Sequence, residues 1–178
     1  MNTHAPLISR QAIEERVRNL AESINRDYAD RTIDIIYVIS GSSVFCADLA
    51  RNLKVPVRLH PMSFSAYPGA SPSGEVRMNL DVAEPLHGRH IMLLEGIIVS
   101  GRTPKFVLDS LRLRQPASLA LCALGVKRGA LAVDLTVNYS GFELGPEIIV
   151  GYGVGEGAEK IIPFLTCRAE QPAKSKSG

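Results

Sequence analysis

The residues best suited to chemistry lie in one segment, from His90 to Arg114. There an apolar run ends in a carboxylate, Glu95, and the small-residue stretch Ser100-Gly101-Arg102-Thr103 follows. We expect the run to be a strand and the stretch to be the loop that opens a helix. Ligands of α/β proteins bind at the carboxyl ends of strands, and the free N–H groups at a helix N-terminus bind anions, most often phosphate. The segment therefore predicts a phosphate site, with an ordinary helix N-cap as the alternative.

The helix after this loop is predicted from its first residues and its apolar spacing. Thr103 is expected to cap it, and Pro104 suits the first helical position. Its buried face is expected to contain Phe106, Val107, Leu111 and Leu113.

Alternating helices and apolar strands surround this segment, which is typical of an α/β protein with a mainly parallel sheet. Ser9 is expected to cap a first helix that runs to about Ala29, with its apolar face spaced at helical intervals. Two prolines, Pro56 and Pro61, push one strand toward a sheet edge. The Pro-, Gly- and Ser-rich residues 63–74 predict one long loop, of the kind that forms a lid or is disordered. The remaining expected elements are strands at 33–39, 55–62, 75–80, 90–94, 118–126, 133–139, 147–150 and 161–165, and a helix at 44–53.

The composition bounds the class of protein. The chain has 178 residues, of which 46% are hydrophobic and 21% charged, with a net charge of +2. This indicates one globular domain at 9–168, a loose N-terminus at 1–8 and a disordered tail at 169–178. A balanced charge argues against a nucleic-acid partner, and no apolar run is long enough for a membrane helix or a secretory signal. We therefore expect a cytoplasmic protein.

The cysteines and histidines do not form a recognisable metal pattern. Cys46, Cys122 and Cys167 are widely spaced in apolar surroundings, which indicates buried free thiols rather than a zinc site. The four histidines do not cluster, and each is expected on the surface or in a turn.

One motif resembles a known family. Leu93-Leu94-Glu95-Gly96-Ile97-Ile98-Val99-Ser100-Gly101-Arg102-Thr103 resembles the phosphoribosyl pyrophosphate motif of hypoxanthine-guanine phosphoribosyltransferases. The upstream residues 44–49, and the downstream stretches 137–143 and 150–153, resemble other parts of the same family, and the registers agree from about Asp34 to Leu165. The resemblance implies a type I phosphoribosyltransferase fold: a mainly parallel central sheet flanked by helices, with a flexible loop and a small C-terminal hood.

The resemblance also implies a reaction and a set of sites. Such enzymes transfer ribose 5-phosphate from phosphoribosyl pyrophosphate to a purine nitrogen, and pyrophosphate leaves with the help of Mg²⁺. By resemblance, Glu95 and Gly96 are the ribose positions, with Glu95 a weak metal ligand. The other implied positions are Val99, Ser100, Gly101, Arg102 and Thr103 for the 5′-phosphate; Ser40 and Gly41 for the pyrophosphate loop; Lys127, Ile148 and Ile149 for the purine; and Ser65 and Tyr67 for the flexible loop.

Several family groups are replaced here. The aspartate assigned as the acid/base partner of the purine aligns with Val99, and the second carboxylate of the motif aligns with Gly96. The hood aspartate near Mg²⁺ aligns with Gly155, and the pyrophosphate-loop lysine aligns with Ser40. A general acid or base contributes roughly 10²–10⁴ in rate, so the pattern predicts weak or lost turnover.

Two functions follow, and the choice between enzyme and non-enzyme stays open. The first is a protein that binds a purine nucleotide or a phosphoribosyl ligand, with catalysis weak or lost and a regulatory or scaffolding role toward a protein partner. The alternative is an active purine phosphoribosyltransferase of purine salvage. The resemblance further implies a weakened Mg²⁺ site and a homo-oligomer, either a dimer or a tetramer.

Overall fold

The computed structural model describes residues 5–66 and 76–168, which form one six-stranded sheet with helices on both faces and a small C-terminal hood. The strand order is β3-β2-β1-β4-β5-β6, and only β3 runs antiparallel to its neighbour. The predicted α/β class and the mainly parallel sheet are confirmed. The elements are α1 (Arg10–Asp27), β1 (Ile33–Val38), α2 (Ser43–Asn52), β2 (Val57–Ala66), β3 (Val76–Leu80), β4 (His90–Ile98), α3 (Arg102–Arg112), β5 (Ser118–Val126), η1 (Arg128–Ala130), β6 (Tyr139–Glu143), β7 (Ile149–Val150), η2 (Ala158–Ile161) and β8 (Thr166–Cys167).

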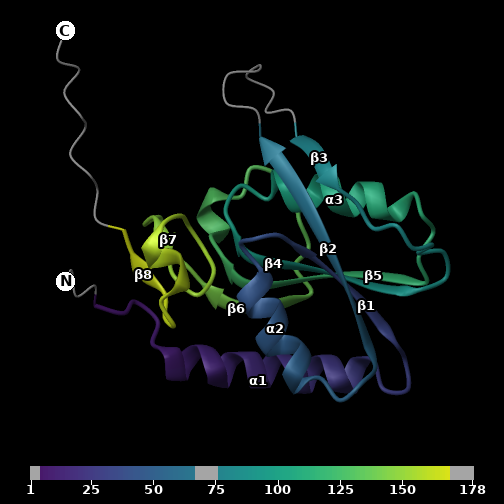
Figure 1. Cartoon of the computed structure of the whole chain (residues 1–178), viewed down its shortest axis with the longest axis horizontal. Helices are drawn as coiled ribbons and strands as arrows, with labels where there is room; N and C mark the ends of the chain where they lie inside the picture. The colour runs from purple at the N-terminus through teal and green to yellow at the C-terminus, as the bar shows by residue number, and fades with distance from the viewer. Residues whose placement is uncertain (1–4, 67–75, 169–178) are drawn as a thin grey trace, which may run out of the picture.

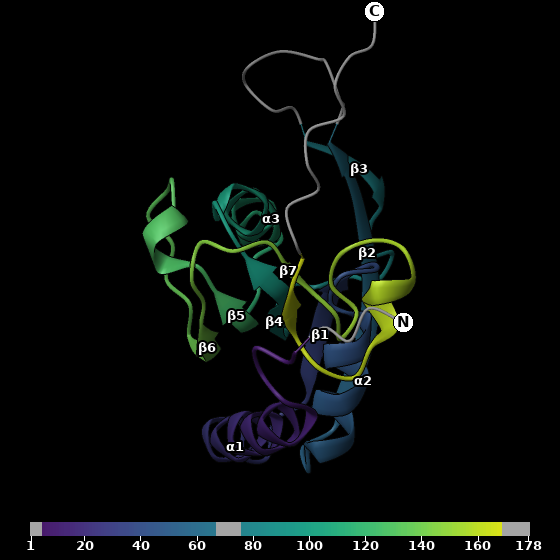
Figure 2. The ribbon, with the colours of Figure 1, turned by 90° about the vertical axis from the view of Figure 1, so that its left-hand side faces the viewer.

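Three layers result, with α1 and α2 on one face of the sheet and α3 on the other (Figures 1 and 2). Alternate residues of β4 supply the two cores, because successive side chains of a strand point to opposite faces. Met92 and Leu94 pack with α1 and α2, whereas Ile91 and Leu93 pack with α3. A strand that is apolar on both faces is what a buried parallel sheet requires.

Helix α1 follows its predicted pattern closely. The Ser9 hydroxyl accepts a hydrogen bond from the Ala12 N–H at 3.2 Å and so caps the helix. The buried face contains the residues that recur at helical spacing: Ile13, Val17, Leu20, Ala21 and Ile24.

The two prolines, Pro56 just before β2 and Pro61 within it, have a different outcome from the one predicted. β2 is not an edge strand, because it lies between β1 and β3. However, β3 pairs only with Ser63–Ala66 of β2, beyond both Pro56 and Pro61. The outer side of β2 is therefore free of a strand partner where the prolines lie, so their missing N–H groups cost no ladder hydrogen bond.

Helix α3 begins two residues earlier than predicted. Its N-cap is Gly101, in the left-handed conformation with φ of 75°, and Thr103 is not the cap. Pro104 belongs to the buried face together with Val107, Leu108 and Leu111. Phe106 and Leu113 are exposed, contrary to prediction.

Two predicted C-terminal strands are absent from the described residues. Residues 131–138 alternate between partly buried and exposed side chains, as a strand would, but they form no ladder, and β6 begins only at Tyr139. The Asn138 side chain instead accepts the Leu121 N–H at 2.8 Å, where a strand carbonyl would otherwise do so. Residues 161–165 are likewise not a strand, because η2 ends at Ile161 and β8 begins at Thr166.

The hood lies beside the chain's N-terminal residues. β7 and β8 pair antiparallel, and the Leu7 and Ile8 N–H groups both donate to the Leu165 carbonyl. The predicted disordered tail at 169–178 lies outside the described residues. The three cysteines are free thiols, of which Cys46 and Cys122 are buried.

A fully buried carboxylate, Asp34 of β1, lies at the amino end of the sheet. One of its oxygens accepts hydrogen bonds from Arg58 at 2.9 Å, His60 at 2.8 Å and Arg89 at 3.0 Å, and the other accepts a second bond from Arg58 at 2.9 Å. Burial acts to raise the Asp34 pKa, but these bonds together outweigh it and hold the pKa below its ordinary value. His60 is buried in this cluster, contrary to the prediction of a surface or turn histidine.

Candidate active site

A cavity of about 270 Å³ opens at the carboxyl end of β4. This is the end of the sheet at which α/β proteins bind ligands. The cavity brings together the predicted ribose residue Glu95 with Val99, Ser100, Gly101 and Thr103 of the predicted phosphate loop. It is completed by Val38, Ile97, Ile98 and Pro104.

The β4–α3 loop presents free donors. The N–H groups of Gly101 and Thr103 have no hydrogen-bond partner in the part of the chain that the structure describes, and the Arg102 N–H makes only a long contact, 3.4 Å, to the Ser100 hydroxyl. Gly101 is required on two counts. It has a positive φ, and a Cβ there would lie 3.2 Å from the side chains of Leu131, Val133 and Leu135. The loop is thus held in a conformation that leaves donors at a helix N-terminus free to bind an anion.

Glu95 is the one titratable residue among those that line this cavity. Burial raises its pKa to about 7. It makes no hydrogen bond or ion pair with the described residues, so no protein group offsets its desolvation. A carboxyl that is half protonated near neutral pH can accept or donate a hydrogen bond to a ligand hydroxyl.

Gly96 faces the β1–α2 loop and has no space for a side chain. A Cβ at Gly96 would lie 2.4 Å from the Gly41 carbonyl oxygen and 3.3 Å from Val154. A carboxylate at this position would therefore require the predicted pyrophosphate loop to move, because that loop occupies the space that the side chain would need.

Val99 and Lys127 directly follow the ends of the neighbouring strands β4 and β5. The register pairs Ile98 with Val126, and the Lys127 N–H donates to the Ile98 carbonyl at 2.9 Å. Val99 lines the cavity and is 49% exposed, so its apolar side chain is open to solvent.

The position of Lys127 just after a strand would also suit an ordinary solvent-exposed lysine. In the structure its side chain is buried, with 8% of its surface exposed. Its ammonium donates to the carbonyls of Pro146, at 3.3 Å, and Glu147. It forms no ion pair with any described residue. Of the other two predicted purine residues, Ile148 is exposed and Ile149 is buried.

A functional candidate that the sequence reasoning missed is Lys160 of η2. Its ammonium donates to the Ser40 hydroxyl, although the two residues are 120 positions apart. The hood thereby brings a cation to the loop where a family lysine is replaced by Ser40. No local sequence pattern reveals this contact, because it joins two segments that are far apart in the chain.

The sequence matches a known protein family over most of its length. Residues 7–156 match the family model described as the phosphoribosyl transferase domain. A hypoxanthine phosphoribosyltransferase of Haemophilus influenzae is 36% identical over 152 residues, which cover 83% of this chain and 85% of that protein. The chain belongs to the hypoxanthine-guanine phosphoribosyltransferase family.

Solved structures of the family agree. A crystal structure of a hypoxanthine-guanine phosphoribosyltransferase from Bacillus anthracis has a TM-score of 0.87 and 34% identity, covering 95% of this chain and all of that one. A Trypanosoma cruzi hypoxanthine phosphoribosyl transferase, studied for the role of its C-terminal region in oligomeric state and activity, has a TM-score of 0.87 and 27% identity, covering 94% of this chain and 93% of that one. The type I phosphoribosyltransferase fold is therefore confirmed. None of these relatives supports the prediction that catalysis is lost.

The family's magnesium ion fits this chain only in part. Among residues 5–66 and 76–168, no three His, Cys, Asp or Glu side chains gather as a metal site. At the hood position Gly155, a Cβ would lie 2.9 Å from Val150. Mg²⁺ usually keeps only one or two protein carboxylates and relies on substrate phosphates. Glu95 is the carboxyl available in the cavity, which fits a metal that is held mainly by the substrate.

The flexible-loop residues can be placed only in part. Ser65 lies in β2, so the long loop predicted at 63–74 is wrong for residues 63–66, and Tyr67 lies outside the described residues. No helix among the described residues is long and apolar enough to cross a membrane.

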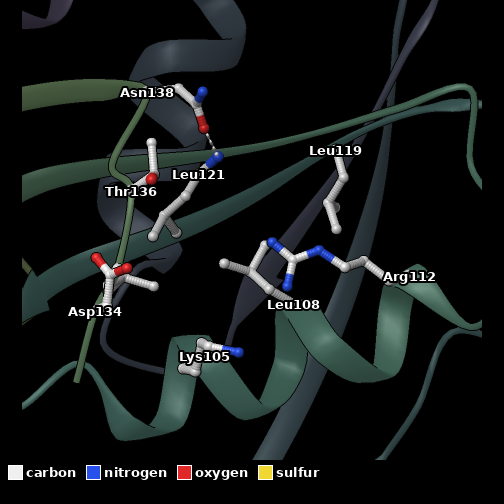
Figure 3. Close-up of a pocket in the computed structure, with 9 residues that line it drawn as sticks. Lys105, Leu108, Arg112, Leu119, Leu121, Asp134, Thr136 and Asn138 are labelled. Atoms are coloured by element: carbon white, nitrogen blue, oxygen red, sulfur yellow. Dashed lines mark hydrogen bonds between the residues drawn. The ribbon is translucent and has the colours of Figure 1, made fainter.

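A second cavity, of about 360 Å³, lies between α3 and the extended segment that precedes β6 (Figure 3). Asp134, Thr136 and Asn138 face it from that segment, and Lys105 and Arg112 face it from α3. Both cations are paired with Asp109, at 2.5 Å each. The two cations of this cavity are therefore already compensated, and among its charged side chains only Asp134 has no ion pair with a described residue.

Proposed function

We propose that this chain transfers the 5-phosphoribosyl group of phosphoribosyl pyrophosphate to a purine base, giving a nucleoside monophosphate and pyrophosphate in purine salvage. The observation that carries the proposal is the β4–α3 loop. Its free Gly101 and Thr103 N–H groups open into the same cavity as the unpaired Glu95. Family membership supplies the reaction that such a loop would serve.

The phosphate end of the substrate would anchor the rest. The N–H groups of Gly101 and Thr103, the hydroxyls of Ser100 and Thr103, and the positive end of the α3 dipole would hold the 5-phosphate. The exposed Arg102 adds a positive charge at the rim of the loop. Because phosphate is held at one fixed point, the ribose is oriented for attack at C1′.

The leaving group would lie toward the Ser40 loop and the hood. Lys160 is the cation that this chain directs there. Mg²⁺, when bound with the substrate's pyrophosphate, would neutralise charge on the departing oxygens. Glu95 would bind ribose hydroxyls beneath the phosphate loop.

The base would enter beside Val99 and Lys127. The buried ammonium of Lys127 keeps one proton for a purine oxo group after it has donated to the two backbone carbonyls. Ile148 and Ile149 would supply apolar contact.

A second candidate, nucleotide binding with little or no turnover, is favoured by one specific observation. Val99 stands where the family handles the purine proton, and a valine cannot accept it. General acid–base catalysis contributes roughly 10²–10⁴ in rate, whereas the ground-state phosphate contacts remain.

The deciding experiment is release of pyrophosphate from phosphoribosyl pyrophosphate with hypoxanthine or guanine and Mg²⁺. The proposal expects base-dependent release that falls at least tenfold in a Ser100→Ala/Thr103→Ala variant, and remains unchanged in the matched control Thr136→Ala in the second cavity. Binding of a nucleoside monophosphate without any release of pyrophosphate would favour the second candidate instead.

A further inference from the structure

Tyr152, in the hood between β7 and η2, has a backbone conformation that bulky side chains rarely adopt. Its φ is 49°, in the left-handed region, and the glycines on either side, Gly151 and Gly153, also have positive φ. A residue other than glycine in this region is strained and persists only where surrounding contacts hold it, as happens most often at functional sites. The contacts that hold Tyr152 therefore indicate what this turn does.

The side chain of Tyr152 joins the hood to α2. It is buried, and its hydroxyl donates to one oxygen of the Asp48 carboxylate at 2.5 Å. Burial raises the pKa of Tyr152, so the hydroxyl keeps its proton and remains a donor. The other oxygen of Asp48 pairs with Arg51 on the same helix. Removal of the Tyr152 hydroxyl would therefore break the link between hood and helix without leaving Asp48 unpaired.

The main chain of the same turn holds the segment that carries Lys160. The Tyr152 N–H donates to the Ile162 carbonyl at 2.8 Å, and the Gly153 N–H donates to the Lys160 carbonyl at 2.7 Å. The Lys160 ammonium in turn donates to the Ser40 hydroxyl of the β1–α2 loop. A chain of contacts thus runs from α2 through this turn to the Lys160 backbone, and it determines where the ammonium lies.

We propose that Tyr152 is a positioning residue: its bond to Asp48 holds the hood in the arrangement that directs Lys160 at the β1–α2 loop, and thereby sets the affinity for the pyrophosphate group of the substrate. This inference rests on the proposed function, because it assigns a role beside the same site. Tyr152 does not line the cavity that contains Glu95, so it acts through Lys160. When fewer molecules hold the hood in this arrangement, the apparent affinity falls by the same factor.

The test compares two ligands that differ in whether they contain pyrophosphate. Phosphoribosyl pyrophosphate with Mg²⁺ needs both the β4–α3 loop and Lys160, whereas ribose 5-phosphate needs only the cavity at the end of β4. Tyr152→Phe removes one oxygen and keeps the buried ring. We expect its Kd for phosphoribosyl pyrophosphate to rise by about tenfold, a factor that one hydrogen bond to a charged group can supply, while its Kd for ribose 5-phosphate changes by less than about twofold.

Matched variants separate this role from a general loss of stability. Tyr139→Phe removes the same kind of bond, from a tyrosine hydroxyl to Asp27 at 2.8 Å, and should leave both affinities unchanged. Arg51→Ala removes the other partner of Asp48 and should also leave them unchanged. Asp48→Asn retains an oxygen that accepts from Tyr152 and should bind like the wild type, whereas Asp48→Ala should match Tyr152→Phe.

A double-mutant cycle tests whether Tyr152 acts through Lys160. Lys160→Met removes the ammonium. If Tyr152 only positions this group, Tyr152→Phe should cause no further loss of affinity for phosphoribosyl pyrophosphate in the Lys160→Met background. Losses that multiply in the double variant would overturn the inference, and so would a Tyr152→Phe variant that binds both ligands equally weakly or both as well as the wild type.

Hydrogen exchange of the hood amides distinguishes failure of this inference from failure of the proposed function. The N–H groups of residues 152 and 153 donate to the segment that carries Lys160, so they exchange when this segment opens. In the ligand-free protein, Tyr152→Phe should speed their exchange by about tenfold, and Arg51→Ala should not. If the wild type does not bind phosphoribosyl pyrophosphate, the proposed function fails. Faster exchange in Tyr152→Phe would then still support its role in holding Lys160, and unchanged exchange would overturn it.

Discussion

The charged side chains at the two ends of the central sheet differ in whether other charged groups of the protein compensate them. At the amino end, Asp34 receives four hydrogen bonds from Arg58, His60 and Arg89. At the carboxyl end, Glu95 makes no bond or ion pair with the described residues, and Lys127 has only neutral partners. Compensated charge indicates a structural role, and uncompensated charge indicates a ligand that completes the site.

The largest expected effect is at the amino end. Asp34→Ala removes a fully buried carboxylate and leaves the buried His60 and the partly exposed Arg58 and Arg89 without their shared partner. Loss of one member of a buried charged cluster costs about 3–5 kcal/mol. Urea unfolding should show that loss in the free energy of unfolding, whereas Asp109→Ala, an exposed carboxylate with two ion pairs, should cost under about 1 kcal/mol. Similar losses in the two variants would contradict the contrast.

Glu95 should respond to pH with the opposite sign from Asp34. The Glu95 pKa is raised from 4.5 to about 7 in the folded protein, so ionisation is unfavourable in the folded state. The wild type should therefore lose stability relative to Glu95→Gln as the pH rises from about 4.5 to 7, by up to about 3 kcal/mol. The Asp34 pKa is lowered instead, so the stability that Asp34 provides is present above its unfolded pKa and is lost in acid.

The measurement is the difference in unfolding free energy between each variant and the wild type at pH 4, 5.5 and 8. Glu95→Gln should become progressively more favourable toward pH 8, whereas the cost of Asp34→Asn should shrink toward pH 4 and below. A pH-independent difference for Glu95→Gln would show that this carboxyl ionises normally. Glu22→Gln on the exposed face of α1 serves as the control.

Substitution of Gly96 tests whether the carboxyl end of β4 has space for a side chain at this position. Gly96→Ala places a Cβ 2.4 Å from the Gly41 carbonyl, so the β1–α2 loop must move. Overpacking of this kind costs about 1–3 kcal/mol. We expect that loss of stability together with weaker binding of phosphoribosyl pyrophosphate, because Gly41 belongs to the predicted pyrophosphate loop. Gly129→Ala is the matched control, since nothing lies within 4 Å of a Cβ there. Full stability and binding in Gly96→Ala would show that the loop yields without cost.

The sequence predicted the layers and the loop between β4 and α3 because both depend on local patterns. The apolar run of β4 and the spacing of Ile13, Val17, Leu20 and Ile24 are sufficient for the sheet and for α1. The pairing of Asp34 with Arg89 and the contact of Lys160 with Ser40 join residues far apart in the chain, so no local pattern reveals them. The conflict between Gly96 and Gly41 is likewise a matter of packing between two loops.

The strand expected at 133–139 shows how a correct pattern can give a wrong element. Its alternation is real, with Leu131, Leu135 and Val137 packed on the core. However, a strand needs backbone hydrogen bonds to a neighbouring strand. Here the Leu121 N–H of β5 donates to the side chain of Asn138 instead of to a backbone carbonyl. Burial alternation therefore predicted the orientation of the side chains but not the ladder.

The smallest expected effect on stability is at Lys127, and its sign gives the sharpest contrast with Asp34. Lys127→Met keeps most of the apolar length of the side chain and removes a buried charge that has no ion pair with a described residue. We expect the free energy of unfolding to be unchanged or raised by about 1 kcal/mol, while the affinity for a purine base falls at least tenfold. Urea unfolding and equilibrium binding of hypoxanthine, measured on the same variant, check both halves. A loss of stability comparable to that of Asp34→Ala would mean that the protein itself compensates the Lys127 charge. The two ends of the sheet would then differ in sequence but not in the way they hold buried charge.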